Sequence, residues 1–157
     1  MRPVPGGRDS TQRVKDAIVA LQRVTNSRRI DARRVERSGV PLGLVATGVL
    51  YQVVERGPAR ARVLADQCRM QPAALSRQLG ILESHRYIER APDPTDGRCT
   101  MIRATAEGKA AHVRIQLADD QLFAAHLAGW QEREIVLLAD LLERLVVDLR
   151  APAAAGR

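Results

Sequence analysis

Residues 72–84 bring together side chains that could read the edges of bases. Leu75, Leu79 and Leu82 recur at helical spacing, which predicts a helix with one buried face. The opposite face carries short or polar side chains, namely Ala73, Ser76, Arg77, Gly80 and Ser84. Arginine can bond guanine through two hydrogen bonds or hold a phosphate, and serine does either more weakly. The pattern therefore predicts a helix that enters the major groove of duplex DNA, where bulky side chains would hold the backbone away from the bases.

The competing interpretation of this segment is an ordinary amphipathic helix at the protein surface. Such a helix more often carries glutamate or lysine on its outward face, whereas residues 72–82 contain one basic and no acidic residue. The composition therefore favours entry into the groove. Gln71, at the position that caps this helix, is included among the predicted DNA contacts.

A second group of polar residues belongs to a predicted β-hairpin. Residues 87–91 and 100–103 are typical of two strands, and the segment between them, rich in proline and aspartate, predicts a long turn. Arg98, near the tip, could reach the minor groove, where negative potential attracts arginine, and Asp96 could orient its guanidinium. Arg90, at the base, could hold a phosphate. A solvated hairpin without DNA contacts is the alternative.

Further segments must position these two groups. Residues 63–68 predict a short helix and residues 69–71 a tight connection, after which Pro72 opens the helix described above. An apolar helix opened by Pro41 should form the centre of the core, and residues 59–62 could add a short extended segment. The order helix, turn, helix, hairpin predicts a winged helix-turn-helix, in a mainly α fold with a small β-hairpin wing.

Long helices are expected on both sides of this lobe. Residues 10–37 have helical apolar spacing with a break near 25–27, and Thr105 can cap a helix that ends near residue 128. A last helix carries an apolar stripe over residues 135–149. Such stripes are too large for a lone lobe to cover, so they predict a homodimer.

The expected domain organisation follows from these elements. Residues 1–8, with two prolines and two glycines, predict a disordered lead, and residues 9–157 are expected to form a single domain. Within that domain, the winged lobe should span about residues 41–104. The dimerisation helices should span about residues 10–37 and 106–149.

The distribution of charge favours a polyanionic partner. The 157 residues carry a net charge of +7, with a surplus of six positive charges in residues 1–38, a surplus of three in 39–105 and a deficit of two in 106–157. A basic front and middle suits nucleic acid. Because 23 of the 25 basic residues are arginine, the surplus can also reflect the base composition of the gene. Charge alone therefore does not identify DNA as the partner.

The stretch from Leu64 to Gly108 resembles the MarR family, the multiple antibiotic resistance regulators. The likeness rests on short motifs that occur in the same order, namely Leu64-Ala65, Ser76-Arg77, Leu82-Glu83, Ile88 with Arg90, Asp96-x-Arg98 and Thr105-x-x-Gly108. With the flanking helices it extends over residues 10–149. The resemblance implies a sequence-specific regulator, a repressor, that binds double-stranded DNA. It also implies a homodimer with intertwined terminal helices, whose two lobes grip a pseudo-palindromic site.

The resemblance further implies a small-molecule effector. Ligands of the family bind between the dimer helices and the DNA-binding lobe, near the second helix. This placement points to Leu44, Tyr51 and the segment 26–37 as the lining of such a site. The character of these side chains and of the nearby arginines suits an apolar or aromatic ligand.

Three positions depart from the family pattern. Arg86 stands where glycine usually ends the recognition helix, Gly97 where a second wing arginine is common, and Ala104 where leucine is usual. Glycine suits the left-handed conformation at the end of a helix, and arginine would cost about 1 kcal/mol there. The recognition helix could therefore end differently from those of the family.

Other classes of function find little support. No nucleophile, paired carboxylate or phosphate loop emerges, so we expect neither an enzyme nor a cofactor. The three histidines and two cysteines lack metal-ligand spacing. A disulfide, a signal peptide and a membrane span are not expected, and the cytoplasm, at the nucleoid, is the expected location. The remaining alternative is a winged-helix protein-interaction module without DNA binding, which acidic residues on the recognition face would favour.

Overall fold

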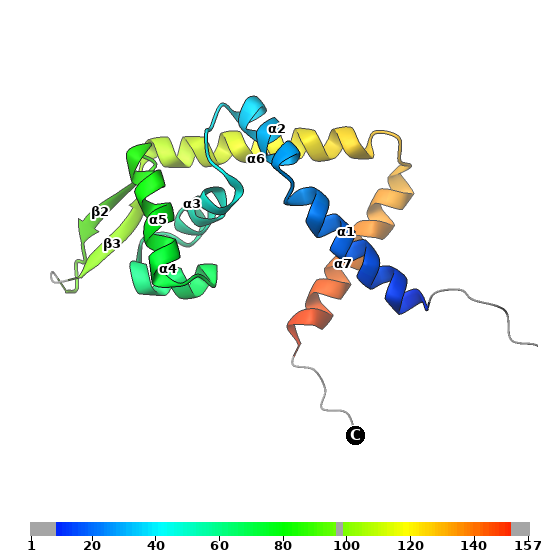
Figure 1. Ribbon diagram of the computed structural model, residues 1–157, viewed down its shortest axis with the longest axis horizontal. Coiled ribbons are helices and arrows are strands. Elements are labelled where there is room, and N and C mark those ends of the chain that lie inside the picture. The colour runs from blue at the N-terminus through cyan, green and yellow to red at the C-terminus, as the bar shows by residue number, and fades with distance from the viewer. Residues whose placement is uncertain (1–8, 97–98, 152–157) are drawn as a thin grey trace, which may run out of the picture. The chain divides into compact units, whose positions relative to one another are not determined.

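The computed structural model describes residues 9–96 and 99–151 (Figure 1). The lead at 1–8, predicted to be disordered, and Arg98 of the predicted wing lie outside the described residues. The chain divides into two compact units, Met1–Asp119 and Asp120–Arg157. Its elements are α1 (Ser10–Thr25), α2 (Arg28–Ser38), α3 (Leu44–Arg56), β1 (Ala59–Arg60), α4 (Ala61–Cys68), α5 (Pro72–Ser84), β2 (Ile88–Pro92), β3 (Thr100–Ala104), α6 (Ala106–Leu127) and α7 (Glu132–Arg150).

The first two helices begin and end at local signals. Asp9 caps α1 by accepting a hydrogen bond from the backbone N–H of Thr11 (3.3 Å), and Ser27 caps α2 through the N–H of Ile30 (3.4 Å). Gly39 ends α2 with a φ of 65°, a left-handed conformation that glycine adopts without strain. The predicted break between the two helices is confirmed.

The central helix α3 begins at Leu44, so the predicted start at Pro41 is wrong. Val40 and Leu42 are each 1% exposed before the helix begins, and the N–H of Leu42 donates to the carbonyl of Val40 (2.8 Å). This tight turn lets two residues that would lie on opposite sides of a helix both pack into the core. Gly43 then occupies the N-cap position without a side-chain hydrogen bond.

The wing is a three-stranded antiparallel sheet in the order β1-β3-β2, not the two-stranded hairpin that the sequence predicts. β2 and β3 pair along their whole length. β1 adds two residues to the other edge of β3, with Ala59 opposite Ile102 and Arg60 opposite Met101. Because α4 begins immediately afterwards, at Ala61, the extended segment is half as long as predicted and the helix is longer.

The core of the lobe lies among α3, α4, α5, the first part of α6 and the sheet (Figure 1). Leu75, Leu79 and Leu82 of α5 are at most 1% exposed, which confirms the buried face predicted from their spacing. The same core contains Val49 and Leu50 of α3, Leu64 of α4 and Ile102 of β3. This packing fixes α5 in one rotation about its axis, so its opposite face must point outward.

The start of α6 is tied to the residues that join α5 to β2. The Thr105 hydroxyl donates to the carbonyl of Arg86 (2.6 Å) and accepts from the N–H of Gly108 (3.0 Å), so the predicted cap is confirmed. Gly108 lies directly against the backbone of Tyr87, where an added Cβ would be 1.9 Å from the carbonyl oxygen. Only glycine fits this contact without a shift of the backbone.

The second unit contains the end of α6 and the whole of α7. A capping box opens α7, in which Gln131 and Glu134 each accept a hydrogen bond from the other's backbone N–H. No residue of α7 is buried within the single chain, and its exposed apolar residues are Val136, Leu137, Leu141, Leu142, Val146, Val147 and Leu149. In the first unit, α1 likewise exposes Val14, Val19, Leu21 and Val24.

Candidate nucleic-acid interface

The outward face of α5 has the composition and exposure expected of a surface that enters a groove. Ala73, Ser76, Arg77 and Gly80 are all exposed, opposite the buried leucines. A Cβ added at Gly80 would meet nothing within 4 Å, so this glycine leaves open space at the surface. Among the described residues, Arg77 has no hydrogen bond or ion pair. The face is therefore short, polar and equipped with one unengaged cation.

The N-terminus of α5 also lies at the surface. Gln71 occupies the N-cap position, is exposed and makes no side-chain cap, while Pro72 has no N–H to satisfy. Because no side chain caps the first turn, the positive end of the helix dipole remains open toward solvent. The two residues thus leave the entry of the helix free of bulky or acidic groups.

Arginines in the left-handed conformation stand at both ends of α5. Arg69, in the turn that follows α4, has a φ of 52°, and Arg86, after α5, has a φ of 58°. The N–H of Arg86 bonds the carbonyl of Glu83 (2.9 Å) and the N–H of Tyr87 bonds that of Leu82 (2.9 Å), which are the paired bonds of a Schellman motif. The helix therefore ends as a glycine would end it, although arginine costs about 1 kcal/mol in this conformation.

Two wing arginines, in contrast, are paired with neighbouring carboxylates. Nε of Arg90 lies 2.5 Å from Oε1 of Glu83, at the last turn of α5, and Nε of Arg103 lies 2.7 Å from Oε1 of Glu89. Arg90, which the sequence predicts to hold a phosphate, is therefore held to α5 by an ion pair. All four side chains are at least a third exposed, so each pair contributes little to stability.

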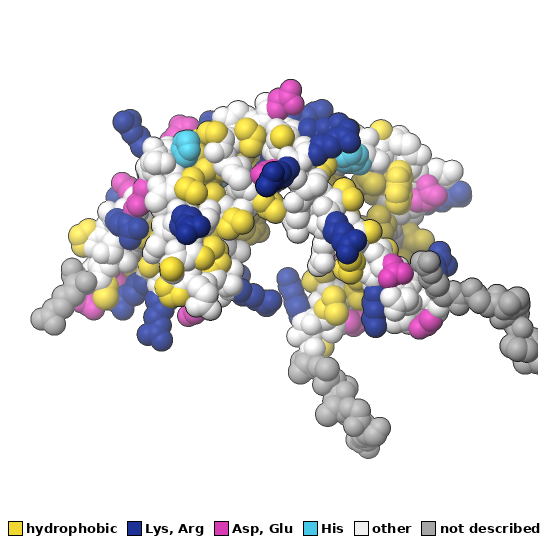
Figure 2. All heavy atoms as spheres, in the orientation of Figure 1, with side chains coloured by type: hydrophobic (Ala, Val, Ile, Leu, Met, Phe, Trp, Pro, Cys, Tyr) yellow, Lys and Arg dark blue, Asp and Glu magenta, His cyan; other side chains and the backbone are white. Residues whose placement is uncertain are grey.

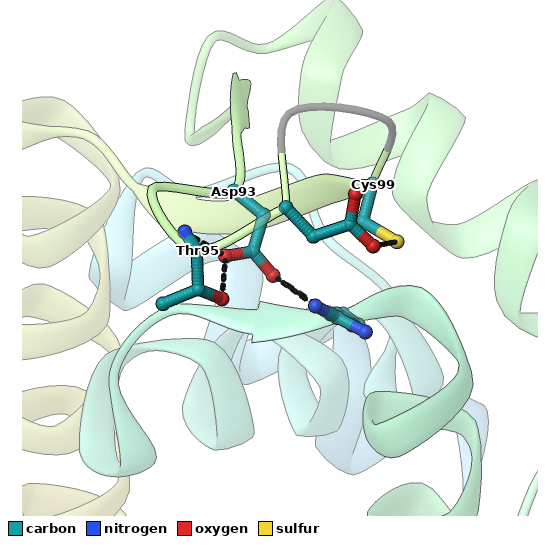
Figure 3. Close-up of polar contacts among 5 residues, drawn as sticks. Asp93, Thr95 and Cys99 are labelled. Atoms are coloured by element: carbon teal, nitrogen blue, oxygen red, sulfur yellow. Dashed lines mark hydrogen bonds and ion pairs between the residues drawn. The ribbon is translucent and has the colours of Figure 1, made fainter.

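Asp93 organises the turn of the wing (Figure 3). It is 6% exposed; its Oδ1 accepts from the N–H (2.8 Å) and hydroxyl (2.7 Å) of Thr95, and its Oδ2 accepts from Nε of Arg60 (2.7 Å). The hydrogen bonds from Thr95, and then that from Arg60, hold the pKa of Asp93 well below its usual value. The hydrogen bond to Asp93 also raises the pKa of Arg60.

Sequence reasoning missed the pair Arg60–Asp93. The residues are 33 positions apart, and no short motif connects them. In the structure Arg60 occupies the N-cap position of α4, where serine, threonine, asparagine or aspartate is preferred, and makes no cap. The sequence, which predicts this helix from residue 63, offers no signal of the pair.

Asp96 lies beside Cys99 in the same turn (Figure 3). Sγ of Cys99 donates a hydrogen bond to Oδ2 of Asp96 at 3.2 Å. This hydrogen bond, and then burial, raise the pKa of the Cys99 thiol, while burial raises the pKa of Cys68. Both thiols are therefore protonated and weakly nucleophilic near neutral pH. The expected partner of Asp96, Arg98, lies outside the described residues.

The residues predicted to line an effector site lie on α3. Leu44 is 40% exposed and Tyr51 is 46% exposed. The Tyr51 ring meets the ring of His112, on α6, edge-on with centroids 5.6 Å apart. His112 is buried, and its Nε2 lies 3.2 Å from Oε1 of Glu55. The structure thus joins Tyr51 to His112, a residue that the sequence did not connect with an effector site.

Two other kinds of site can be assessed over residues 9–96 and 99–151. In those ranges no group of three or more His, Cys, Asp or Glu side chains is placed to hold a metal ion. Nor does any helix there have the length and apolar character needed to cross a bilayer. Basic side chains do protrude from the lower edge of the lobe in the view of Figure 2. This edge of the lobe therefore presents positive charge to solvent.

Comparison with known proteins identifies the family of this winged lobe. A model of the MarR family matches residues 38–98. The uncharacterized HTH-type transcriptional regulator YxaD of Bacillus subtilis is 33% identical over 97 residues, which cover 62% of this chain and 68% of that protein. The chain belongs to the MarR family. It is accordingly a MarR-family transcription regulator, and its relatives are named as regulators rather than enzymes.

Solved structures of other proteins share the fold of the chain. RV1404 of Mycobacterium tuberculosis superposes with a TM-score of 0.75 at 20% identity, covering 94% of this chain and 99% of that one. A mutant of MarR from E. coli, solved in complex with operator DNA, has a TM-score of 0.63 at 21% identity, covering 88% and 99%. At these identities the likeness establishes the winged-helix fold of this MarR-family protein and no residue roles.

Proposed function

We propose that the protein is a sequence-specific repressor that binds double-stranded DNA as a homodimer at a pseudo-palindromic operator. The observation that carries this proposal is the outward face of α5, which is exposed, has no acidic residue over residues 72–82 and presents the unengaged Arg77. In a MarR-family fold such a face is suited to the major groove. The proposal is further supported by the structure of a mutant of MarR from E. coli, which has the same fold and was solved in complex with operator DNA.

Each predicted contact has a distinct part in this proposal. Ala73, Ser76 and Gly80 let the backbone of α5 approach the bases, and Arg77 bonds guanine or a phosphate. Gln71 joins them at the entry of the helix. In the wing, Arg98, oriented by Asp96, reaches the minor groove, and Arg90 exchanges Glu83 for a phosphate.

Homodimerisation is proposed from the exposed apolar faces of α1 and α7. A monomer rarely leaves so many apolar residues of two helices uncovered, and a second copy of the chain would cover them. Two lobes would then meet half-sites about 10 base pairs apart, or a multiple of that spacing. Light scattering at micromolar concentration should give the mass of a dimer, and a monomer would contradict this part of the proposal.

An apolar or aromatic ligand is proposed to tune DNA affinity from a site that includes Leu44 and Tyr51. Both side chains are partly exposed, so a ligand can reach them without displacing the core. A screen of aromatic acids should find one that raises the melting temperature and weakens DNA binding. A ligand that still acts on the Tyr51→Ala variant would show that the effector site lies elsewhere.

The decisive experiment for the whole proposal is selection of bound fragments from random and genomic DNA. We expect enrichment of one pseudo-palindromic sequence, bound much more tightly than unrelated DNA at the same salt concentration. Retention of all sequences in proportion to length would indicate charge-driven binding alone. Retention of none would favour a winged-helix module that binds protein instead.

A further inference from the structure

Arg60 connects the first helix of the helix-turn-helix to the turn of the wing. It is the N-cap residue of α4 but makes no cap; its guanidinium instead contacts Oδ2 of Asp93, with both Nε and Nη2 at 2.7 Å. The Arg60 side chain is 44% exposed, whereas that of Asp93 is 6% exposed. The carboxylate is thus enclosed, and the arginine closes its open side.

Asp93 in turn determines the course of the wing turn. Its N–H donates to the carbonyl of Cys99 (2.9 Å), and its carbonyl accepts from the N–H of Asp96 (3.3 Å). Its other carboxylate oxygen holds both the N–H and the hydroxyl of Thr95. Asp93 is therefore bonded to three described residues of this turn, Thr95, Asp96 and Cys99, and a movement of Asp93 would disturb all three contacts. Figure 3 shows the contacts of its carboxylate.

The backbone alone gives this part of the wing little support. β1 pairs with β3 only at Ile102 and Met101, whereas β2 and β3 continue as far as the pair Pro92–Thr100. Beyond Met101 the two-stranded ribbon has no third strand beside it. A two-stranded ribbon is marginally stable by itself. The side chain of Arg60 extends the reach of β1 past its last backbone pair, to the first residue after β2.

We propose that Arg60 is a positioning residue for the contact between the wing and DNA, acting by holding Asp93 and hence the wing turn in one place relative to α4. This inference rests on the proposed function, because it presumes that the wing touches DNA. A wing that is already ordered loses less conformational entropy on binding than a mobile one. Release of the turn should therefore reduce what the outer base pairs of the DNA site contribute to affinity. The base preferences at the centre of that site should stay unchanged.

The test compares two duplexes that carry the selected site, one of full length and one without the outer base pairs that a wing would contact. The ratio of the two dissociation constants measures the contribution of the outer part. Arg60→Ala and Asp93→Asn should each bring this ratio from several-fold in the wild type toward one. Both variants should bind the short duplex as the wild type does, with the same central base preferences.

Glu89→Gln is the matched control for Asp93→Asn. It removes one negative charge from the same ribbon, where Glu89 holds only the exposed Arg103. Its ratio should stay at the wild-type value, since the wing turn is not released. Asp93→Asn nearly preserves the volume of the side chain, so it serves as the test if Arg60→Ala does not fold, as judged by its thermal transition.

The outcomes separate positioning from direct contact. If Arg60 itself binds a phosphate, Asp93→Asn would free its guanidinium, and the ratio would rise or persist although Arg60→Ala lowers it. That result would overturn the inference, as would a wild-type ratio of one or unchanged ratios in both variants. Failure of the wild type to prefer its selected site over unrelated DNA would instead contradict the proposed function.

Discussion

The outward face of α5 and the wing differ in the state of their arginines. Arg77 on α5 has no partner among the described residues, whereas Arg60, Arg90 and Arg103 around the wing are each held by a carboxylate. The helix owes its placement to apolar packing beneath it. The ribbon, which has little core of its own, is braced by polar pairs across its surface.

This difference teaches that positive charge in the two regions has different availability. A cation on α5 can engage DNA without first leaving a partner, so its removal should cost the whole free energy of its contact with DNA. A cation in the wing must exchange a carboxylate for a phosphate, so part of the gain is offset by the lost pair. The ion pairs of the wing therefore support its shape more than its affinity.

The largest expected effect comes from Gly108→Ala, which would disrupt the backbone contact that supports both α5 and the wing. The new Cβ would lie 1.9 Å from the carbonyl oxygen of Tyr87, at the junction of α5 and β2, and backbone there cannot yield easily. We expect the free energy of unfolding to fall by about 3 kcal/mol or more. Urea denaturation measures it. Gly48→Ala, in a helix with nothing within 4 Å, is the control and should cost nothing; an equal loss in both would contradict the close contact.

The comparison itself is tested by Arg77→Ala against Arg103→Ala. Loss of the unengaged arginine should weaken binding to the selected site by about 1–3 kcal/mol if it reads a base. Loss of the paired arginine removes the same charge but should cost less. Fluorescence anisotropy measures binding to the specific duplex and to an unrelated duplex. Loss of a base contact should weaken binding to the specific duplex alone, whereas loss of a phosphate contact should weaken binding to both equally. Equal losses of affinity for the specific site in the two variants would contradict the proposed difference between the arginines of α5 and of the wing.

Arg86→Gly should stabilise the end of α5 by up to about 1 kcal/mol, because glycine adopts the left-handed conformation without the crowding of a Cβ. Arg86→Ala removes the same charge but keeps the Cβ, so it should give no such gain. The shift of the thermal midpoint reports the difference. Equal midpoints for the two variants would mean that the positive φ of 58° carries no strain.

The smallest effect is expected from Glu83→Gln, which would free Arg90. Stability should change by less than about 1 kcal/mol, since both side chains are partly exposed. DNA binding should tighten slightly on all sequences, because Arg90 no longer has to leave a carboxylate. Titrations at several salt concentrations measure the change. Weaker binding would instead mean that Glu83 places Arg90 for its contact.

The sequence predicted those features that depend on neighbouring residues. The leucines of α5, the connection over residues 69–71 and the Thr105 cap follow from helical spacing and capping preferences, which operate over a few positions. The outward position of Arg77 follows from the same spacing. These are the parts of the fold and of the candidate site that local patterns determine.

Features that depend on distant contacts could not be predicted. The start of α3 at Leu44 reflects the burial of Val40 and Leu42 in a core assembled from other helices. The third strand of the sheet and the pair Arg60–Asp93 arise only when segments about 30 or more residues apart meet. The left-handed conformation of Arg86 is retained because tertiary packing outweighs a local preference of about 1 kcal/mol.

The enclosed carboxylate of Asp93 has a consequence for the response of the wing to acid. A lowered pKa means that its stabilising hydrogen bonds are fully present above the pKa of an unfolded aspartate, about 4, and are lost only as the pH falls through the lower folded value. Between pH 8 and pH 5 the Asp93 carboxylate therefore stays ionised and keeps its hydrogen bonds to Thr95 and Arg60. This carboxylate holds its contacts under mild acid and does not itself sense protons in that range.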